Sequence, residues 1–299
     1  MGQYAVIDLG TNTFHLLIVE TTTQGFKELR RERRFIKLAE NGIERIGAAP
    51  YQRGLNALIE FRSILDQYPV QGIRAFGTAA LRTAENGVAF IEHAREQAKI
   101  DVLLIPGKEE ARLIHLGVGQ AIPALEESIL IMDIGGGSVE FIIADGQQVH
   151  WSQSFPIGVA VLFRAFHQAD PITPAERTAL RAFLENTLGP LKTALQTFPA
   201  QTLVGASGTF DVLEALLPTR SLTSHGAEML VEHYFPFWKK VQGSTQAERL
   251  QMPGMPKDRA DMIVVALELV AYIIELAQIE RIWISQFAMK EGMLAEMIG

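Results

Sequence analysis

Residues 129–144 read ILIMDIGGGSVEFIIA, with two apolar runs on either side of an acidic residue, three glycines and a hydroxyl. Each run is short and rich in Ile and Val, which predicts two buried strands. Glycines between the strands let backbone N–H groups converge where a Cβ would otherwise intrude, and such donors bind phosphate. Asp133 would repel a phosphate unless a cation lay between them, which suggests a divalent metal such as Mg²⁺. The alternative is a tight hairpin with a glycine bulge.

A second copy of this pattern stands at the N-terminus, where residues 5–19 read AVIDLGTNTFHLLIV. Asp8 aligns with Asp133, Gly10 with Gly135, and Thr13 with Ser138. Internal duplication predicts two similar domains, each with its own strand, acidic loop and strand. Ligands usually bind in clefts between domains, so we expect the two loops to face a shared ligand.

A third glycine-rich segment, residues 203–211, reads LVGASGTFD. It predicts a strand, a loop of small residues and a helix that begins near Asp211. The N-terminus of a helix offers N–H groups and a positive dipole to a phosphate. Small residues also occur where a strand and a helix pack closely, so this segment supports a phosphate site only together with the other two.

Five motifs in one order resemble the exopolyphosphatase / guanosine pentaphosphate phosphohydrolase (Ppx/GppA) family in its short two-domain form. They are DLGTNTFH (residues 8–15), GTAALR (77–82), EEARLI (109–114), DIGGGS (133–138) and GASGT (205–209). The resemblance implies an α/β fold with two ribonuclease-H-like domains of the actin–sugar kinase–Hsp70 superfold. Each domain would be a mixed sheet flanked by helices, with the ligand cleft between them. We expect the domains to be residues 1–124 and 125–287, with the terminal helix at 288–299 packing back on the first.

The resemblance also implies roles for individual residues. Glu110 would be the general base that takes a proton from the attacking water, and Arg82 would bind phosphate. Without the resemblance, an exposed salt bridge is the commoner role for such an arginine, and the helix dipole explains acids in a first helical turn. The expected phosphate-binding residues are Gly10, Thr11, Asn12, Gly135, Gly136, Gly137, Ser138, Ser207, Gly208 and Thr209. The expected ligands of Mg²⁺, or of another divalent cation, are Asp133 with Glu140 or Asp8; the direction of Glu140 depends on the phase of its strand.

Composition limits the possible partners and the compartment. The net charge of −7 provides no overall basic field for nucleic acid. The chain has no Cys, and its N-terminus shows no signal peptide, so we expect a cytoplasmic protein. The longest apolar run, residues 262–277, contains Glu268 and Glu275 and predicts a buried helix rather than a membrane span. By resemblance the protein would be a homodimer.

The expected function is hydrolysis of terminal phosphate from inorganic polyphosphate or guanosine pentaphosphate, the latter a substrate linked to the stringent response. Residues 285–292 read SQFAMKEG, whereas the family tends to show S-D-G-x-L-R-E-G, so a non-catalytic sensor of polyphosphate or of a guanosine penta- or tetraphosphate stays an alternative. A kinase of the same superfold is another alternative. The basic stretch at residues 27–37 is either a solvated edge strand or a rim that guides polyphosphate. Residues 242–259 are polar and rich in Gly, Pro and Met, which suggests a mobile loop.

Overall fold

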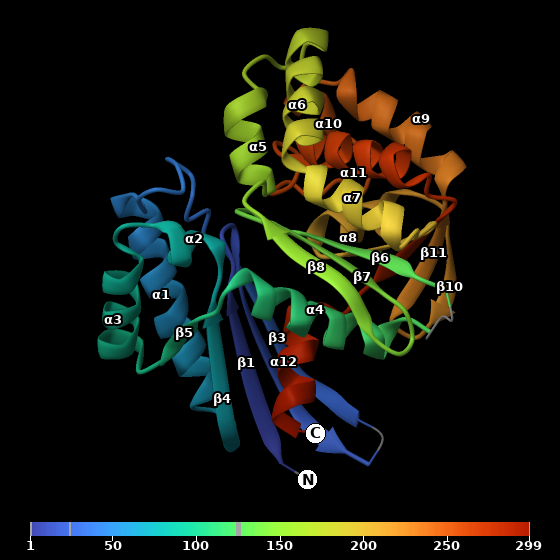
Figure 1. Ribbon diagram of the computed structural model, residues 1–299. Helices are drawn as coiled ribbons and strands as arrows, with labels where there is room; N and C mark the ends of the chain where they lie inside the picture. The colour runs from blue at the N-terminus through green and yellow to red at the C-terminus, as the bar shows by residue number, and fades with distance from the viewer. Residues whose placement is uncertain (1, 24, 124–126, 299) are drawn as a thin grey trace. The chain divides into compact units, whose positions relative to one another are not determined.

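The computed structural model describes residues 2–23, 25–123 and 127–298 (Figure 1). The chain divides into two compact units. Unit 1 comprises Met1–Gly117 and Met289–Gly299, and unit 2 comprises Val118–Ala288. The domain boundary predicted between residues 124 and 125 lies outside the described residues. Among the described residues, no helix is long and apolar enough to cross a membrane.

Unit 1 is a five-stranded mixed sheet with helices on both faces (Figure 1). The sheet order is β3-β2-β1-β4-β5, in which β1, β4 and β5 run parallel. Helices α1 and α3 pack on the face that carries Ala5, Ile7 and Leu9, and α12 contacts β1. The elements are β1 (Gln3–Leu9), β2 (Thr13–Thr22), β3 (Gly25–Phe35), α1 (Ala48–Leu65), β4 (Val70–Gly77), α2 (Ala79–Thr83), α3 (Gly87–Ala98), β5 (Val102–Leu104), the start of α4 (Gly107–Ala121) and α12 (Met289–Ile298).

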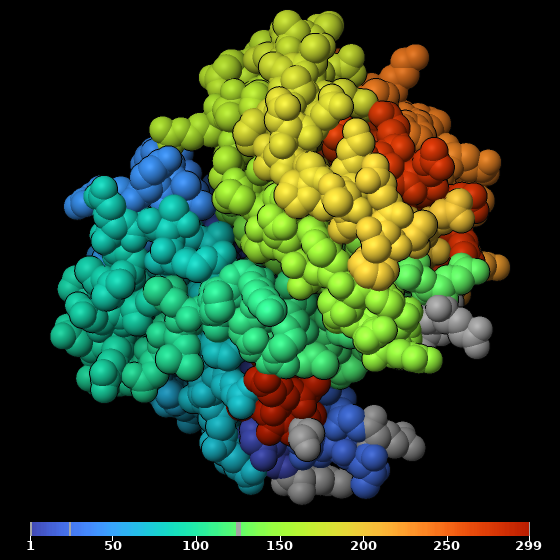
Figure 2. Space-filling view, viewed as in Figure 1, coloured from blue at the N-terminus to red at the C-terminus, as the bar shows by residue number. Residues whose placement is uncertain are grey.

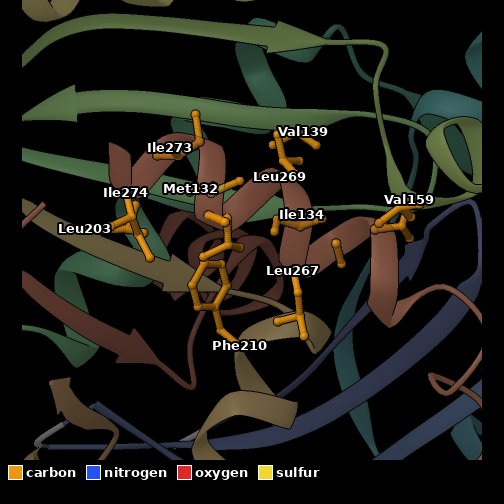
Figure 3. Close-up of a cluster of buried hydrophobic side chains, with 14 of the residues drawn as sticks. Met132, Ile134, Val139, Val159, Leu203, Phe210, Leu267, Leu269, Ile273 and Ile274 are labelled. Atoms are coloured by element: carbon orange, nitrogen blue, oxygen red, sulfur yellow. The ribbon is translucent and has the colours of Figure 1, made fainter. Parts of the chain in front are cut away.

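Unit 2 is a seven-stranded sheet in the order β10-β11-β12-β9-β6-β7-β8. Its core joins the Met132 and Ile134 face of the sheet to α8 and to the apolar helix α11, as Figure 3 shows for Phe210, Leu267 and Ile273. Residues 262–277 are thus mainly a buried helix, as predicted. The elements are β6 (Ile129–Ile134), β7 (Val139–Ala144), β8 (Val149–Phe155), α5 (Val159–Phe166), α6 (Pro174–Thr187), α7 (Gly189–Thr197), β9 (Thr202–Ala206), α8 (Gly208–Leu216), β10 (Thr219–Thr223), β11 (Gly226–Leu230), α9 (Val231–Gln242), α10 (Gln246–Leu250), α11 (Ile263–Ala277) and β12 (Arg281–Ser285).

The two sheets repeat one topology, which confirms the duplication predicted from the two acidic loops. In unit 1 the antiparallel pair β2–β3 follows β1, and β4 and β5 extend the sheet on the other side. In unit 2, β7 and β8 follow β6 in the same way, and β9 and β12 take the places of β4 and β5. Strands β10 and β11 extend the second sheet beyond the repeat.

The basic stretch at residues 27–37 forms most of edge strand β3, and several of its arginines are paired. Arg31 lies 2.8 Å from Glu28, and Arg34 lies 2.9 Å from Glu60. Arg30 makes a similar pair with Glu32 at 2.5 Å. These pairs favour the interpretation of β3 as a solvated edge strand, because charges engaged with one another are less available to a polyanion.

Helix α12 crosses α4 at Gly292 with almost no space between the two backbones. A Cβ on Gly292 would lie 1.8 Å from the carbonyl oxygen of Leu113. The space-filling view shows the atoms of α12, in red, directly against those of α4 (Figure 2). Beside this crossing, the fully buried carboxylate of Glu291 lies 3.2 Å from the Arg31 guanidinium. The Glu-Gly pair of residues 291–292 therefore has a packing role in unit 1.

Replacing Gly292 by Ala should lower the free energy of unfolding by about 1–3 kcal/mol, because the methyl group meets backbone that cannot rotate away. Urea unfolding followed by circular dichroism measures this change. Gly119→Ala is the control in α4, since a Cβ there meets nothing within 4 Å. That variant should be neutral or gain up to about 1 kcal/mol from helix propensity. Equal urea midpoints for the two variants would contradict the packing role of Gly292.

Candidate active site

The carboxyl ends of parallel strands β1, β4 and β5 bring three predicted motifs to one edge of the unit 1 sheet. The N–H of Thr78 donates to Leu9 O over 3.3 Å, and the N–H of Ile105 donates to Gly77 O over 3.2 Å. The turn after β1, the start of α2 and the start of α4 therefore lie side by side. In open α/β sheets, ligands bind beyond this edge.

Arg82 and Glu110 meet at this edge. The Arg82 Nη1 donates to Ile105 O over 2.6 Å and to the Glu110 Oε2 over 3.3 Å. Glu110 stands in the first turn of α4, and the residue is 8% exposed. The guanidinium, itself fixed by a backbone carbonyl, thus orients a largely buried carboxylate. The resemblance implies a general base at Glu110 and a phosphate-binding group at Arg82, and the fold brings these two side chains together.

The neighbouring Glu109 has a different environment from Glu110. Its carboxylate forms hydrogen bonds of 2.8 and 2.6 Å with Arg112, one turn along the same helix. Its side chain is 33% exposed, against 11% for Glu110. The hydrogen bond from Arg112 lowers the pKa of the Glu109 carboxyl below its usual value. An ordinary surface pair therefore accounts for Glu109 but does not account for Glu110.

In unit 2, the two buried acids of the sheet, Asp133 and Glu140, lie in one row across it. Asp133 is paired with Glu140 on β7 and with Ala206 on β9, and Ala206 is paired with Ser285 on β12. Directly opposed residues point to the same face, so Asp133 and Glu140 share a face. This register settles the direction of Glu140 that the sequence left open. In unit 1 the equivalent pair is Asp8 with His15.

Asp133 and Glu140 each accept a hydrogen bond from a serine hydroxyl. The Ser207 Oγ donates to Asp133 Oδ1 over 2.6 Å, and the Ser154 Oγ donates to Glu140 Oε1 over 2.6 Å. Asp133 is 6% exposed and Glu140 is 1% exposed. Two hard oxygen donors on one face fit Mg²⁺, which often takes one or two carboxylates and completes its shell with water and substrate phosphate. Within the described residues, no group of three or more His, Cys, Asp or Glu side chains is arranged to hold a metal.

The two glycine turns have the same geometry. The Gly10 N–H donates to Thr13 O over 3.1 Å, and the Gly135 N–H donates to Ser138 O over 3.0 Å. A Cβ on either glycine would lie 2.9 Å from the carbonyl oxygen that its own N–H reaches. Glycine is therefore required at the same position of both repeats by the same close approach.

A neighbouring segment fixes the direction of each turn. In unit 2, the N–H groups of Val159 and Ala160 donate to the carbonyls of Gly135 and Gly136 over 3.0 and 2.9 Å. Because a trans peptide points its C=O and N–H in opposite directions, the N–H groups of Gly136 and Gly137 point away from α5. The contact with α5 therefore fixes the direction in which both N–H groups face.

In unit 1, the segment after β3 takes the place of α5. Backbone N–H groups of residues 36–38 donate to the carbonyls of Thr11 and Asn12. The hydroxyl oxygens of Thr11 and Thr13 are buried, and the described residues offer them no hydrogen-bond partner. Buried polar atoms are normally satisfied, so these two hydroxyls are among the exceptions in unit 1.

The third predicted phosphate loop differs in detail from the prediction. Helix α8 begins at Gly208, three residues before the predicted start near Asp211. Thr209 is buried in its first turn, while the Ser207 hydroxyl is directed at Asp133. A Cβ on Gly208 would lie 2.1 Å from the Nη2 of Arg259, so this guanidinium covers the start of the helix.

Arg259 is a candidate site residue that the sequence analysis missed. It is placed beside Gly208 by the segment before α11, and its Nε lies 3.5 Å from Asp258 Oδ2. The guanidinium is suited to binding phosphate in bidentate fashion. Its one sequence signal was a cation just before a buried helix, which is too common to single out a ligand.

Comparison with known proteins identifies the family to which this chain is similar. A family model described as the Ppx/GppA phosphatase family matches residues 17–299. The crystal structure of an exopolyphosphatase from Cytophaga hutchinsonii superposes with a TM-score of 0.93 at 36% identity, over 99% of this chain and 97% of that one. A Ppx/GppA family member from Aquifex aeolicus has the same fold, with a TM-score of 0.81 at 24% identity over 99% of this chain and 98% of that one.

Curated relatives cover the whole of this chain but extend beyond it. The guanosine-5'-triphosphate,3'-diphosphate pyrophosphatases of Photobacterium profundum and Vibrio atlanticus are 29% and 30% identical to it. Each match covers 99% of this chain and 59% of the relative, so the chain spans about three-fifths of their length. With a family model over nearly its full length and a solved homologue at 36% identity, the chain belongs to the Ppx/GppA phosphatase family.

Proposed function

We propose that this protein hydrolyses a phosphoanhydride and releases terminal phosphate from inorganic polyphosphate or guanosine pentaphosphate. The observation that carries the proposal is Glu110, a largely buried carboxylate oriented by Arg82 at the carboxyl edge of the unit 1 sheet. The names of the relatives, an exopolyphosphatase and two guanosine pentaphosphate pyrophosphatases, support the same class of reaction.

Glu110 is the proposed general base. A carboxylate that takes the proton of the attacking water makes that water a better nucleophile as the bond to phosphorus forms. Arg82 orients Glu110 and supplies positive charge for an equatorial phosphate oxygen. The pairing of Arg82 with the Ile105 carbonyl leaves further guanidinium N–H groups for such an oxygen.

The glycine turns are the proposed phosphate-binding elements. The N–H groups of residues 11–13 and 136–138 and the loop at Ser207–Gly208–Thr209 are the donors, and Arg259 adds a cation beside Gly208. Asp133, together with Glu140 or Asp8, is the proposed set of metal ligands. A bound Mg²⁺ or similar cation would neutralise charge on the transferred phosphate.

The two alternatives receive less support. A kinase would require a base specific for its phosphate acceptor. The relatives are named for hydrolysis, which favours water as the acceptor. A silent sensor would not need a buried carboxylate held at Glu110, although the altered segment at residues 285–292 differs from the family pattern. Ser285 in that segment bonds to the Phe287 carbonyl over 2.6 Å, and Phe287 stacks on His225, so the altered residues are packed together.

Further proposals concern partners and compartment. We propose a polyphosphate chain or a guanosine penta- or tetraphosphate as the ligand, because Arg82 and Arg259 supply local cations beside the proposed phosphate-binding turns. Nucleic acid and membrane surfaces are not proposed as partners, because the net charge of −7 provides no overall basic field. The absence of Cys fits action in a reducing cytoplasm. A homodimer is proposed from the family alone.

The test is phosphate release without an added acceptor. Purified full-length protein is incubated with long-chain polyphosphate or guanosine pentaphosphate, with Mg²⁺ and after chelation by EDTA. We expect Mg²⁺-dependent release from at least one substrate, and background release after chelation. Binding of either compound without release, in the presence of Mg²⁺, Mn²⁺ or Ca²⁺, would overturn the hydrolase and leave the sensor.

A further inference from the structure

Ser207 has a backbone conformation that side chains rarely adopt. Its φ is 72° and its ψ is −180°, immediately after strand β9. This region is almost restricted to glycine, because a Cβ is crowded there, and other residues occupy it when the surrounding structure imposes it. Ser207 therefore stores strain between β9 and α8.

The same conformation explains how Ser207 reaches Asp133. Ala206 is paired with Asp133 across the β6–β9 ladder, so these two side chains share a face. Successive side chains in a strand point to opposite faces, and a continuing strand would turn Ser207 away from Asp133. The reversed backbone instead brings the Ser207 Oγ to 2.6 Å from the Asp133 Oδ1.

We propose that Ser207 is a positioning residue for Asp133, and that its strained backbone persists because it delivers this hydrogen bond. The inference rests on the proposed function, in which Asp133 is a metal ligand, and it replaces the direct phosphate contact expected for Ser207. A hydroxyl bound to one carboxylate oxygen restricts the rotation of the carboxyl group that would ligate the metal. Partners of this kind typically contribute about 10–100-fold to metal affinity.

Two variants separate the hydroxyl from the strain. Ser207→Ala and Ser207→Gly both remove the hydroxyl, but glycine alone relieves the backbone. We expect both to weaken binding of Mn²⁺, measured by electron paramagnetic resonance on the full chain, by about 10-fold or more. We also expect the glycine variant to melt about 2–4 °C above the alanine variant, because it adopts the conformation without strain.

Ser154 provides the matched control. It donates an equally short hydrogen bond to Glu140 from the regular strand β8. In a regular strand glycine is less favourable than alanine, so Ser154→Gly should melt below Ser154→Ala. The order of the two melting temperatures should therefore reverse between positions 154 and 207.

The outcomes separate the inference from the function on which it rests. Wild-type affinity for Mn²⁺ in Ser207→Ala overturns the positioning role, and so does an unaltered protein that does not bind Mn²⁺. A Ser207→Gly variant that melts below Ser207→Ala contradicts the claim that the backbone at position 207 is strained. Weakened Mn²⁺ binding in a protein that releases no phosphate supports the inference and overturns the hydrolase instead.

Discussion

Glu110→Gln should lower the kcat for phosphate release by about 10²–10⁴-fold, the usual contribution of a general base. Glutamine has the size of glutamate and keeps an oxygen that can accept the hydrogen bond from Arg82, so the local packing is retained. It cannot take a proton from water at neutral pH. The loss should therefore appear in kcat, with little change in KM or in the melting temperature.

The control for this prediction is the adjacent residue. Glu109→Gln makes the same chemical change one position earlier on α4, at a side chain that pairs with Arg112 on the surface. A surface pair of this kind contributes little to stability, so Glu109→Gln should fold normally. Because Glu109 has no proposed part in the reaction, this variant should also keep wild-type kcat. Full activity in Glu110→Gln, or an equal loss in the two variants, would contradict the role of Glu110 as the general base. Phosphate release under substrate saturation, at matched protein concentrations, gives the kcat of each variant.

The duplicated acidic turn could be predicted from sequence because its geometry depends on local residues. In both repeats a glycine stands shortly after the acid, and a small hydroxyl residue stands three positions after that glycine. This pattern gives the same close approach at Gly10 and Gly135. The buried strands around them are short and β-branched, which is a local signal as well. The capping box at Thr173 and Glu176 was predictable for the same reason, and the structure has it.

Features that depend on tertiary contacts could not be predicted in this way. The face of Glu140 depends on the register of β6 and β7, and a slip of one residue would turn its side chain to the opposite face. The contact of Arg259 with Gly208 joins distant parts of unit 2, and a single sequence has no signal for it. Ser207 was expected to face the phosphate, but its hydroxyl meets Asp133 because of a backbone conformation that composition does not reveal.

The prediction of a loop at residues 242–259 was wrong for residues 246–250, which form helix α10. A capping box at Thr245 and Glu248 starts that helix. Arg249 is 1% exposed and donates to Ala260 O over 2.6 Å and to Asp170 over 3.2 Å. Polar composition suggested a solvated loop, but a buried arginine with several acceptors anchors the segment that carries Arg259.

Gly158→Ala should lower kcat/KM for phosphate release by about 100-fold, because it displaces the phosphate turn of unit 2. The Cβ would lie 2.4 Å from the carbonyl carbon and oxygen of Gly136 and from the nitrogen of Gly137. Those three atoms belong to the peptide between Gly136 and Gly137, whose N–H is a proposed phosphate donor. A shift of about 1 Å in such a group can cost about 100-fold. The backbone of Gly158, at φ −60° and ψ 163°, suits alanine, so the clash is the cause of any loss.

The control is Gly189→Ala at the start of α7, where a Cβ meets nothing within 4 Å. Gly158 is the N-cap of α5 and Gly189 is the first residue of α7, so both variants change the start of a helix of unit 2, but only Gly158→Ala introduces a clash. We expect Gly189→Ala to keep wild-type kcat/KM and melting temperature, and Gly158→Ala to lose activity while its far-ultraviolet circular dichroism stays native. Wild-type kcat/KM in Gly158→Ala would mean that the turn moves without consequence, and that the donors of Gly136 and Gly137 do not hold the phosphate.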